Sequence, residues 1–232
     1  MNLLSGLLAV IAVLENEILL AMLFVFTGIV FDFFDGFAAR LFKVSGELGK
    51  QLDSLADMVT SGVVPGIIML KLIEVNTINT SNSFFDNSII GISLVGLVLT
   101  LGACYRLAKF NIDTRQSDSF IGLPTPANAL FILSLPLVLR YSDSFFLLEL
   151  LTNPFVLIGI TLLSVYMLNA EISLFSLKIK QMGVKKNALQ FSFLGCSIGL
   201  LVVFQYAGIP LVIVLYVLLS VANNALTKMN RL

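Results

Sequence analysis

Four aspartates lie within residues 31–57, in a stretch whose other side chains are mostly apolar: Asp32, Asp35, Asp53 and Asp57. On a helix, the first two are three residues apart and the last two are four apart, so each pair lies on one face. Small and cationic residues share these faces: Gly36, Ala39, Arg40 and Lys43 with the first pair, and Gly49 with the second. Acidic residues at these intervals in an apolar helix predict a functional site.

The two predicted helices are joined near residues 44–46. If they pack antiparallel, Asp32 lies level with Asp57, Asp35 with Asp53, and Arg40 with Gly49. Four carboxylates would then meet in a site of low dielectric constant, which is costly unless they are protonated, paired or neutralised by metal.

Carboxylates without histidine or cysteine suit hard divalent cations, so we expect Mg²⁺ or Mn²⁺ at this site. Four carboxylates are enough for two ions, and a pair of ions is a known device for phosphoryl transfer. In that interpretation Gly36, Ala39 and Gly49 leave space for a ligand, and Arg40 binds phosphate. Two alternatives stay open. The small residues are also typical of helix packing, and intramembrane aspartates also occur in ion-coupled transporters.

The composition places these charges in a membrane protein. Of 232 residues, 58% are hydrophobic and only 12% are charged, which is too little polar surface for a soluble domain of this length. The charges of the fourteen basic and fourteen acidic residues cancel. The net charge therefore gives no reason to expect nucleic acid as a partner. The chain has no histidine, which excludes His general bases and imidazole metal sites.

Apolar segments predict an all-α, polytopic bundle of about eight transmembrane helices in a single integral membrane domain, residues 1–232. The segments lie near 2–14, 18–43, 47–73, 88–108, 125–141, 153–170, 189–206 and 208–226. The first is shorter than the roughly 20 residues that a full crossing needs. We expect residues 1–170 to form the catalytic core, and 171–232 to add a basic cytosolic loop and two C-terminal helices.

The charges of the loops predict the orientation. Twelve of the fourteen lysines and arginines fall on alternate connections and at the C-terminus, and only Lys71 and Arg140 fall on the others. Because positive residues concentrate on the cytosolic side, we expect both termini and the aspartate hairpin to be cytosolic. The polar residues 76–88 are then expected to form a connecting loop on the opposite side.

The hairpin reads Asp-x2-Asp-Gly-x2-Ala-Arg-x8-Gly-x3-Asp-x3-Asp from residue 32 to residue 57. This resembles the signature of the CDP-alcohol phosphotransferase family at all eight positions. The resemblance implies a six-helix core, usually dimeric, that transfers a phosphatidyl or related group from a CDP-linked donor to an alcohol and releases CMP. It implies that Asp32, Asp35, Asp53 and Asp57 are metal ligands with Asp57 also the general base, and that Gly36, Ala39, Arg40 and Gly49 surround the cytidine diphosphate.

Members of this family usually have a longer N-terminal approach, with a proline-asparagine-leucine stretch that helps line the nucleotide pocket. This sequence begins directly at MNLLSG. We therefore expect either a shortened first helix or a start further upstream.

A second block, ACYRLAKFNIDTRQSDSFIGLPTPANA at residues 103–129, resembles the phosphatidylserine synthases of the membrane-embedded type. This implies CDP-diacylglycerol and L-serine as substrates. A serine carboxylate favours arginine, so Arg106 and Arg115 are predicted to contact the acceptor or the diphosphate, although ordinary membrane topology would also place cations there. Gly122–Pro126 would serve as a gate or simply start a helix. Another acceptor, glycerol phosphate or inositol phosphate, and a transporter remain the alternatives.

Overall fold

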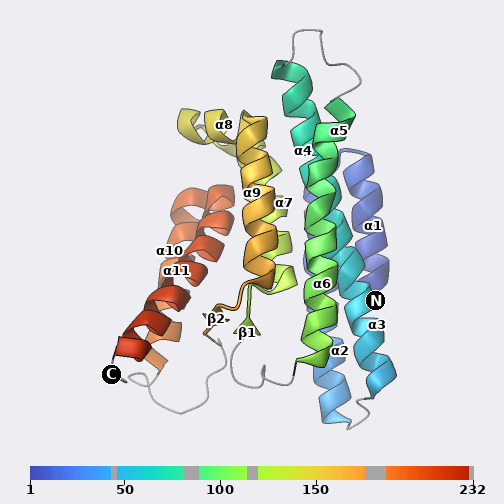
Figure 1. Ribbon diagram of the computed structural model, residues 1–232, viewed down its shortest axis with the longest axis vertical. Coiled ribbons are helices and arrows are strands. Elements are labelled where there is room, and N and C mark those ends of the chain that lie inside the picture. Colours follow the sequence, from blue (N-terminus) through green and yellow to red (C-terminus); the bar gives the residue numbers. More distant parts are fainter. Residues whose placement is uncertain (43–45, 81–88, 114–119, 176–186, 230–232) are drawn as a thin grey trace.

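The computed structural model describes residues 1–42, 46–80, 89–113, 120–175 and 187–229, which form a bundle of helices (Figure 1). This confirms the all-α class and the polytopic bundle. The helices are α1 (Asn2–Leu14), α2 (Ile18–Leu41), α3 (Glu47–Asp57), the π-helix η1 (Met58–Val63), α4 (Val64–Thr80), α5 (Ile89–Ser93), the 3-10 helix η2 (Leu94–Leu97), α6 (Val98–Ile112), α7 (Thr125–Tyr141), α8 (Phe145–Thr152), α9 (Pro154–Asn169), α10 (Ala188–Phe204), the 3-10 helix η4 (Gln205–Ala207) and α11 (Gly208–Met229).

All eight apolar segments predicted from the sequence contain helix, but the number of membrane crossings is not confirmed. Four helical stretches of the described residues are long and apolar enough to cross a membrane, or five if α8 and α9 count as one span bent by 79°. The difference has physical causes. Helix α1 has only 13 residues, and one 37-residue stretch, 189–225, reverses direction at Gln205, whose φ is 47°.

The core lies where α4, α6, α7 and α9 meet. Large apolar side chains from each of these helices are fully buried there: Ile68, Met69, Ile73, Leu99, Ile132, Leu133 and Leu157. The outward faces are also apolar, as the exposed Phe26, Leu101 and Leu163 illustrate. A helix that is apolar on both faces suits a lipid environment, in which the helix satisfies its own backbone polar groups. The chain is therefore an integral membrane protein.

The connections fall at two opposite ends of the bundle. The end of α2, the start of α3 and the end of α6 lie together at the lower end in Figure 1, whereas α8 and the end of α4 lie at the upper end. Lys71 belongs to the upper part, where its Nζ donates to the backbone oxygens of Val13 and Leu14 at the end of α1. Lys71 is thus separated along the bundle axis from the charged residues at the end of α2 and the start of α3.

The polar segment 76–88 was expected to be a loop throughout, and this is wrong for its first part. Helix α4 continues to Thr80. The side chains of Asn76 and Thr77 donate to the backbone oxygens of Leu72 and Ile73, one turn earlier in the same helix. Polar side chains that bond back to the helix do not have to end it. Residues 81–88 lie outside the described residues.

A short two-stranded sheet at the lower end was not predicted. Strand β1 (Phe120–Ile121) pairs antiparallel with β2 (Ser173–Leu174). Gly122 follows with φ of 75°, and a Cβ there would lie 2.5 Å from the backbone oxygen of Leu168. Only glycine tolerates both constraints. Pro124 then caps α7, so the Gly122–Pro126 stretch starts a helix.

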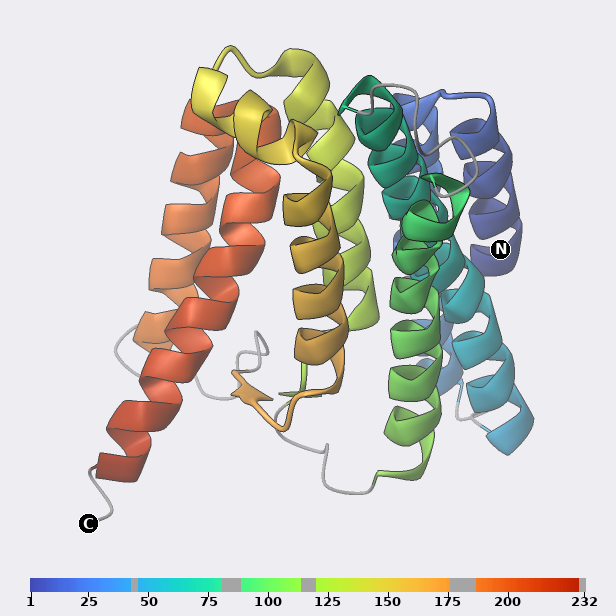
Figure 2. The same ribbon diagram turned by 45° about the horizontal axis from the view of Figure 1, so that its top comes forward.

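The C-terminal helices α10 and α11 form an antiparallel hairpin on one side of the bundle (Figure 2). Its inner face packs around an aromatic cluster of Phe175, Phe193 and Tyr216, whose ring centroids are 5.0–5.8 Å apart. The Tyr216 hydroxyl donates to the Phe175 backbone oxygen at 2.9 Å. This hairpin is held by aromatic packing and a few polar contacts to β2 and its neighbours.

Candidate active site

Two of the four predicted aspartates meet at the start of α1. The Asn2 side-chain amide, Nδ2, lies 2.9 Å from Asp57 Oδ1 and 3.4 Å from Asp32 Oδ1. Asn2 is 4% exposed, and both carboxyl groups are half-buried. One amide therefore joins α2 to the end of α3 through two aspartates that are 25 residues apart in the sequence.

Asp53 lies one turn before Asp57 and contacts Asp32. Its carboxyl group is within hydrogen-bonding distance of the Asp32 carboxyl group, and both Asp53 and Asp57 interact electrostatically with Asp32. Asp35 is exposed and has no hydrogen bond or ion pair with another described residue. The structure thus brings together Asp32, Asp53 and Asp57 but not, in this arrangement, Asp35.

The route by which the carboxylates converge differs from the expected one. We expected α2 and α3 to pack directly against each other, but their described parts make little direct contact, and the start of α1 packs against both. Asp32 is level with Asp57, as predicted, because both face Asn2. The turn near residues 44–46 lies largely outside the described residues, as does Lys43.

The position of Asn2 is fixed from the other side by Thr60. The Thr60 hydroxyl lies 2.8 Å from Asn2 Oδ1 and 3.3 Å from the Asn2 backbone oxygen. Thr60 is fully buried and belongs to η1, the π-helix that begins directly after Asp57. Such π-helical turns are frequent at functional sites. Sequence reasoning missed both residues, although Asn2 is the one side-chain amide among the first 14 residues.

The carboxylates fit a divalent cation by their chemistry, although no group of three or more Asp, Glu, Cys or His side chains among the described residues is arranged as a metal site. Two carboxyl groups in hydrogen-bonding contact, such as Asp32 and Asp53, need a shared proton or a cation between them. Oxygen donors at this density, in a chain without histidine, are the ligands of hard cations such as Mg²⁺. The donor set therefore fits such an ion.

The predicted nucleotide-binding residues line the same end of α2 and α3. Gly36 and Ala39 are half-buried on α2. Gly49 is exposed on α3, and a Cβ at this position would meet no atom within 4 Å. Arg40 lies in the last turn of α2, and its side chain is outside the described part of the structure. Gly49 thus borders open space, and the nucleotide-binding role of the three small residues stays a prediction.

A polar contact ties the helix of Asp53 and Asp57 to α6. Asn111 donates from Nδ2 to the Ser54 hydroxyl at 2.9 Å, and Lys50 Nζ donates to the Asn111 backbone oxygen. Asn111 belongs to the second sequence block. The contact links α3 to the second sequence block on α6.

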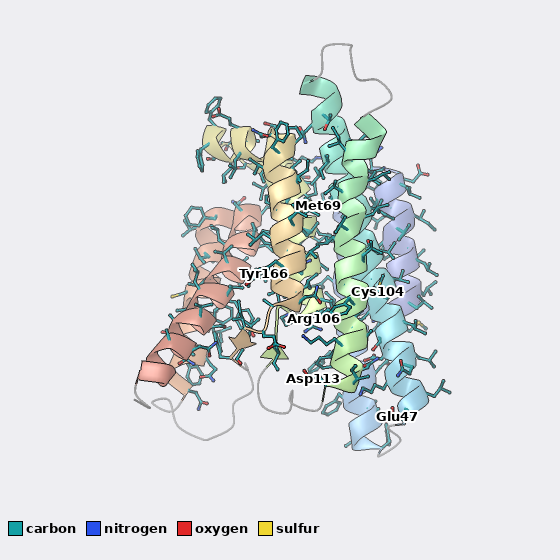
Figure 3. The ribbon with its side chains drawn as sticks, viewed as in Figure 1. Glu47, Met69, Cys104, Arg106, Asp113 and Tyr166 are labelled. Carbon is teal, nitrogen blue, oxygen red and sulfur yellow. The ribbon has the colours of Figure 1, made fainter. Side chains whose placement is uncertain are left out.

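Arg106 is buried on α6 with 7% of its surface exposed. Its Nε donates to the Leu123 backbone oxygen at 2.7 Å, and its Cζ lies 5.5 Å from the centre of the Phe110 ring. It is close enough to Asp57 to interact electrostatically. Figure 3 places it between the lower parts of α6 and α9. Arg106 thus points into the bundle, whereas Arg115 lies outside the described residues.

A comparison of the sequence with known protein families finds a match over most of the chain. Residues 1–166 match the family described as "CDP-alcohol phosphatidyltransferase". The chain belongs to this family. The match confirms the resemblance seen in the aspartate hairpin, and it covers every helix from α1 to α8 and nearly all of α9.

Curated relatives are similar to this chain over more than half of its length. A protein of Bacillus subtilis named "CDP-diacylglycerol--serine O-phosphatidyltransferase" is 38% identical over 125 residues, which are 54% of this chain. A protein of Helicobacter pylori with the same name is 32% identical over 166 residues, or 71% of this chain. An "Archaetidylserine synthase" of Methanothermobacter thermautotrophicus is 28% identical over 169 residues. This chain spans 64% of the length of each of these relatives.

Proposed function

We propose that this protein is a membrane-embedded phosphatidylserine synthase. It would transfer the phosphatidyl group from CDP-diacylglycerol to the hydroxyl of L-serine and release CMP. The observation that carries this proposal is the convergence of Asp32, Asp53 and Asp57, the first and last of which share the Asn2 amide, in a chain of the CDP-alcohol phosphatidyltransferase family. The names of the relatives in Bacillus and Helicobacter support serine as the acceptor.

The donor would bind beside the aspartates. Gly36, Ala39 and Gly49 would lie along the cytidine diphosphate, and Arg40 would form charge-assisted hydrogen bonds with the diphosphate. The acyl chains would stay in the bilayer and enter between helices, because the outward faces of the bundle are apolar. The enzyme then need not extract its lipid from the membrane.

Proteins of this family generally use divalent metal ions. Asp32, Asp35, Asp53 and Asp57 are the residues that would hold two such ions, Mg²⁺ or Mn²⁺. When bound, the ions would offset the negative charge of the diphosphate and of the carboxylates themselves. The Asn2 amide would keep Asp32 and Asp57 at a fixed separation, as residues that orient metal ligands do in other sites.

The transfer step needs a base for the acceptor. We assign this role to Asp57, which would take the proton of the serine hydroxyl as its oxygen attacks the diacylglycerol-linked phosphorus. The new oxygen–phosphorus bond forms in line with the bond that breaks, and CMP leaves with the electrons of that bond. Arg40 would stabilise the charge that develops on the departing phosphate.

The site would face the cytosol. Among the described residues, Lys50, Arg106 and Lys109 belong to α3 and α6 at the end of the bundle that carries Glu47 and Asp113 in Figure 3. Cytosolic loops concentrate positive charge. In this orientation both termini are cytosolic, with about eight crossings. Residues 1–170 would form the catalytic core, and the enzyme would act as a homodimer with residues 171–232 as an additional basic loop and hairpin.

The test is CMP release by the purified chain in detergent with CDP-diacylglycerol, Mg²⁺ or Mn²⁺, and one alcohol at a time. L-Serine, glycerol phosphate and inositol phosphate are the alcohols to compare. Asp53→Asn is the blank, and Asp143→Asn, the same change at an exposed residue between α7 and α8, is the matched control. We expect release that depends on serine, that stops with a chelator, and that returns with either metal.

Each other result rejects a part of the proposal. Release with another alcohol but not with serine would keep the carboxylate site and reject the acceptor. No release with any alcohol would reject the transferase and favour the ion-coupled transporter. Release that survives chelation would reject the metal.

A further inference from the structure

A small cavity lies between the end of α6, the strand β1 and the end of α9. It is lined by Arg106, Lys109, Phe110, Ile121, Leu168, Asn169 and Ala170. One of these residues, Arg106, is close enough to Asp57 to interact electrostatically with it. The two basic residues come from one helix and the amide from another, so the cavity presents different chemistry on its two walls.

The α6 wall offers hydrogen-bond donors. Arg106 uses its Nε for the Leu123 backbone oxygen, and its two terminal nitrogens make no further hydrogen bond within the described part of the chain. A buried guanidinium normally has its donors satisfied. This wall therefore fits an anionic group, and a planar carboxylate matches the paired terminal nitrogens of arginine.

The α9 wall offers an acceptor. Asn169 donates from Nδ2 to the backbone oxygens of Gly102 and Val165 at 3.2 and 3.0 Å. These two bonds fix its orientation and leave Oδ1 buried, with no hydrogen-bond partner among the residues that the structure describes. An amide oxygen in this state is an acceptor in need of a donor. A purely anionic ligand, such as a diphosphate, would leave it unsatisfied.

Lys109 lines the cavity and forms an ion pair with Glu171. Its Nζ lies 3.5 Å from Glu171 Oε1, and its side chain is 30% exposed. A partly exposed ion pair of this kind is held weakly, so Lys109 can turn aside from Glu171 and toward an incoming anion. The cavity has room for about one water molecule, and this movement would enlarge it.

We propose that this cavity is the binding site for the α-amino and α-carboxylate groups of the acceptor amino acid. Arg106 and Lys109 bind the carboxylate, and Asn169 Oδ1 accepts a hydrogen bond from the ammonium. The acceptor hydroxyl then extends toward Asp57. The inference rests on the proposed serine-dependent transfer, and it makes Asn169 a residue that selects amino acids over other alcohols.

The experiment measures the KM for L-serine in serine-dependent CMP release by full-length variants in detergent. Asn169→Leu removes the acceptor and both donors, whereas Asn169→Asp keeps the acceptor and loses the donors to Gly102 and Val165. We expect Asn169→Leu to raise the KM for serine at least about tenfold, because a hydrogen bond to a charged group is lost. Asn169→Asp should stay within about threefold of the wild type, since the acceptor that this hydrogen bond needs is kept.

Two analogues test the two walls separately as inhibitors of serine transfer. 3-Hydroxypropionate lacks the ammonium, and ethanolamine lacks the carboxylate. Asn169→Leu should leave the inhibition constant of 3-hydroxypropionate unchanged. Arg106→Lys should raise that constant and leave the constant of ethanolamine unchanged. Asn153→Leu, at the other end of α9, is the matched control and should change none of these values.

An unchanged KM for serine in Asn169→Leu would overturn the inference while serine-dependent release still supports the transferase. Equal losses in Asn169→Leu and Asn169→Asp with every ligand would also overturn it, because they would indicate a structural role for the amide. If the wild type releases CMP only with another alcohol, the proposed function and this inference both fall.

Discussion

The two sides of the bundle are held together by different chemistry. Where α1, α2 and α3 meet, buried polar groups determine the arrangement, since Asn2 joins two aspartates and Thr60 fixes Asn2. In the hairpin of α10 and α11, aromatic rings make the contact and the Tyr216 hydroxyl adds one bond to a backbone oxygen.

The difference indicates where function lies. Buried carboxylates are costly in a membrane and contribute nothing to apolar packing, so a cluster of them persists where a ligand needs it. Aromatic contacts stabilise a hairpin without requiring any ligand. We therefore expect changes in the first region to alter transfer with little loss of folding, and changes in the second to alter folding with little loss of transfer.

The largest effect is expected from Asp57→Asn. The amide keeps the shape of the side chain and can still contact Asn2, but it can no longer take a proton or bind a cation strongly. CMP release should fall at least about a thousandfold, within the range attributed to general-base catalysis. The thermal unfolding temperature in detergent should stay close to that of the wild type. Substantial remaining turnover would remove Asp57 as the base.

A smaller effect is expected from Asn2→Ala, which leaves every carboxylate in place. Without the bridging amide, Asp32 and Asp57 lose their common partner, and kcat should fall about 10- to 100-fold, as for other residues that orient metal ligands. The metal concentration needed for half-maximal activity should rise in parallel. A fall in kcat without that rise would mean that Asn2 acts on substrate and not on the carboxylate pair.

The smallest effect on transfer is expected from Tyr216→Phe. The substitution removes the hydroxyl and its bond to Phe175 but keeps the ring, so the free energy of unfolding should fall by about 1 kcal/mol. Serine-dependent CMP release per folded molecule should not change. If release drops as much as in Asn2→Ala, the hairpin contributes to the site and the contrast between the two regions fails.

Much of the fold was predictable because helix formation in a membrane is a local matter. A run of apolar residues has to satisfy its backbone hydrogen bonds internally, and this fixed the positions of α2, α7 and α11. The pairing of β1 with β2 was not predictable, because two residues on each strand leave no periodic pattern. The number of crossings depends on bends such as the one between α8 and α9, which hydropathy does not report.

The sequence by itself predicted which residue types would carry the chemistry. The spacing of Asp32 with Asp35 and of Asp53 with Asp57 is a property of single helices, and it sufficed to predict an oxygen-rich site for phosphoryl transfer. The family match is consistent with that prediction. These features depend only on neighbours within two helical turns.

Only the tertiary structure decided how those residues meet. Asn2 lies 30 residues from Asp32 and 55 from Asp57, and no helical period relates such positions. Their contact depends on where α1 starts and on the π-helical turn that directs Thr60 toward it. The cavity of Arg106 and Asn169 likewise joins α6 to α9, 63 residues apart in sequence. Contacts of this kind follow from the packing of whole helices, which no short segment specifies.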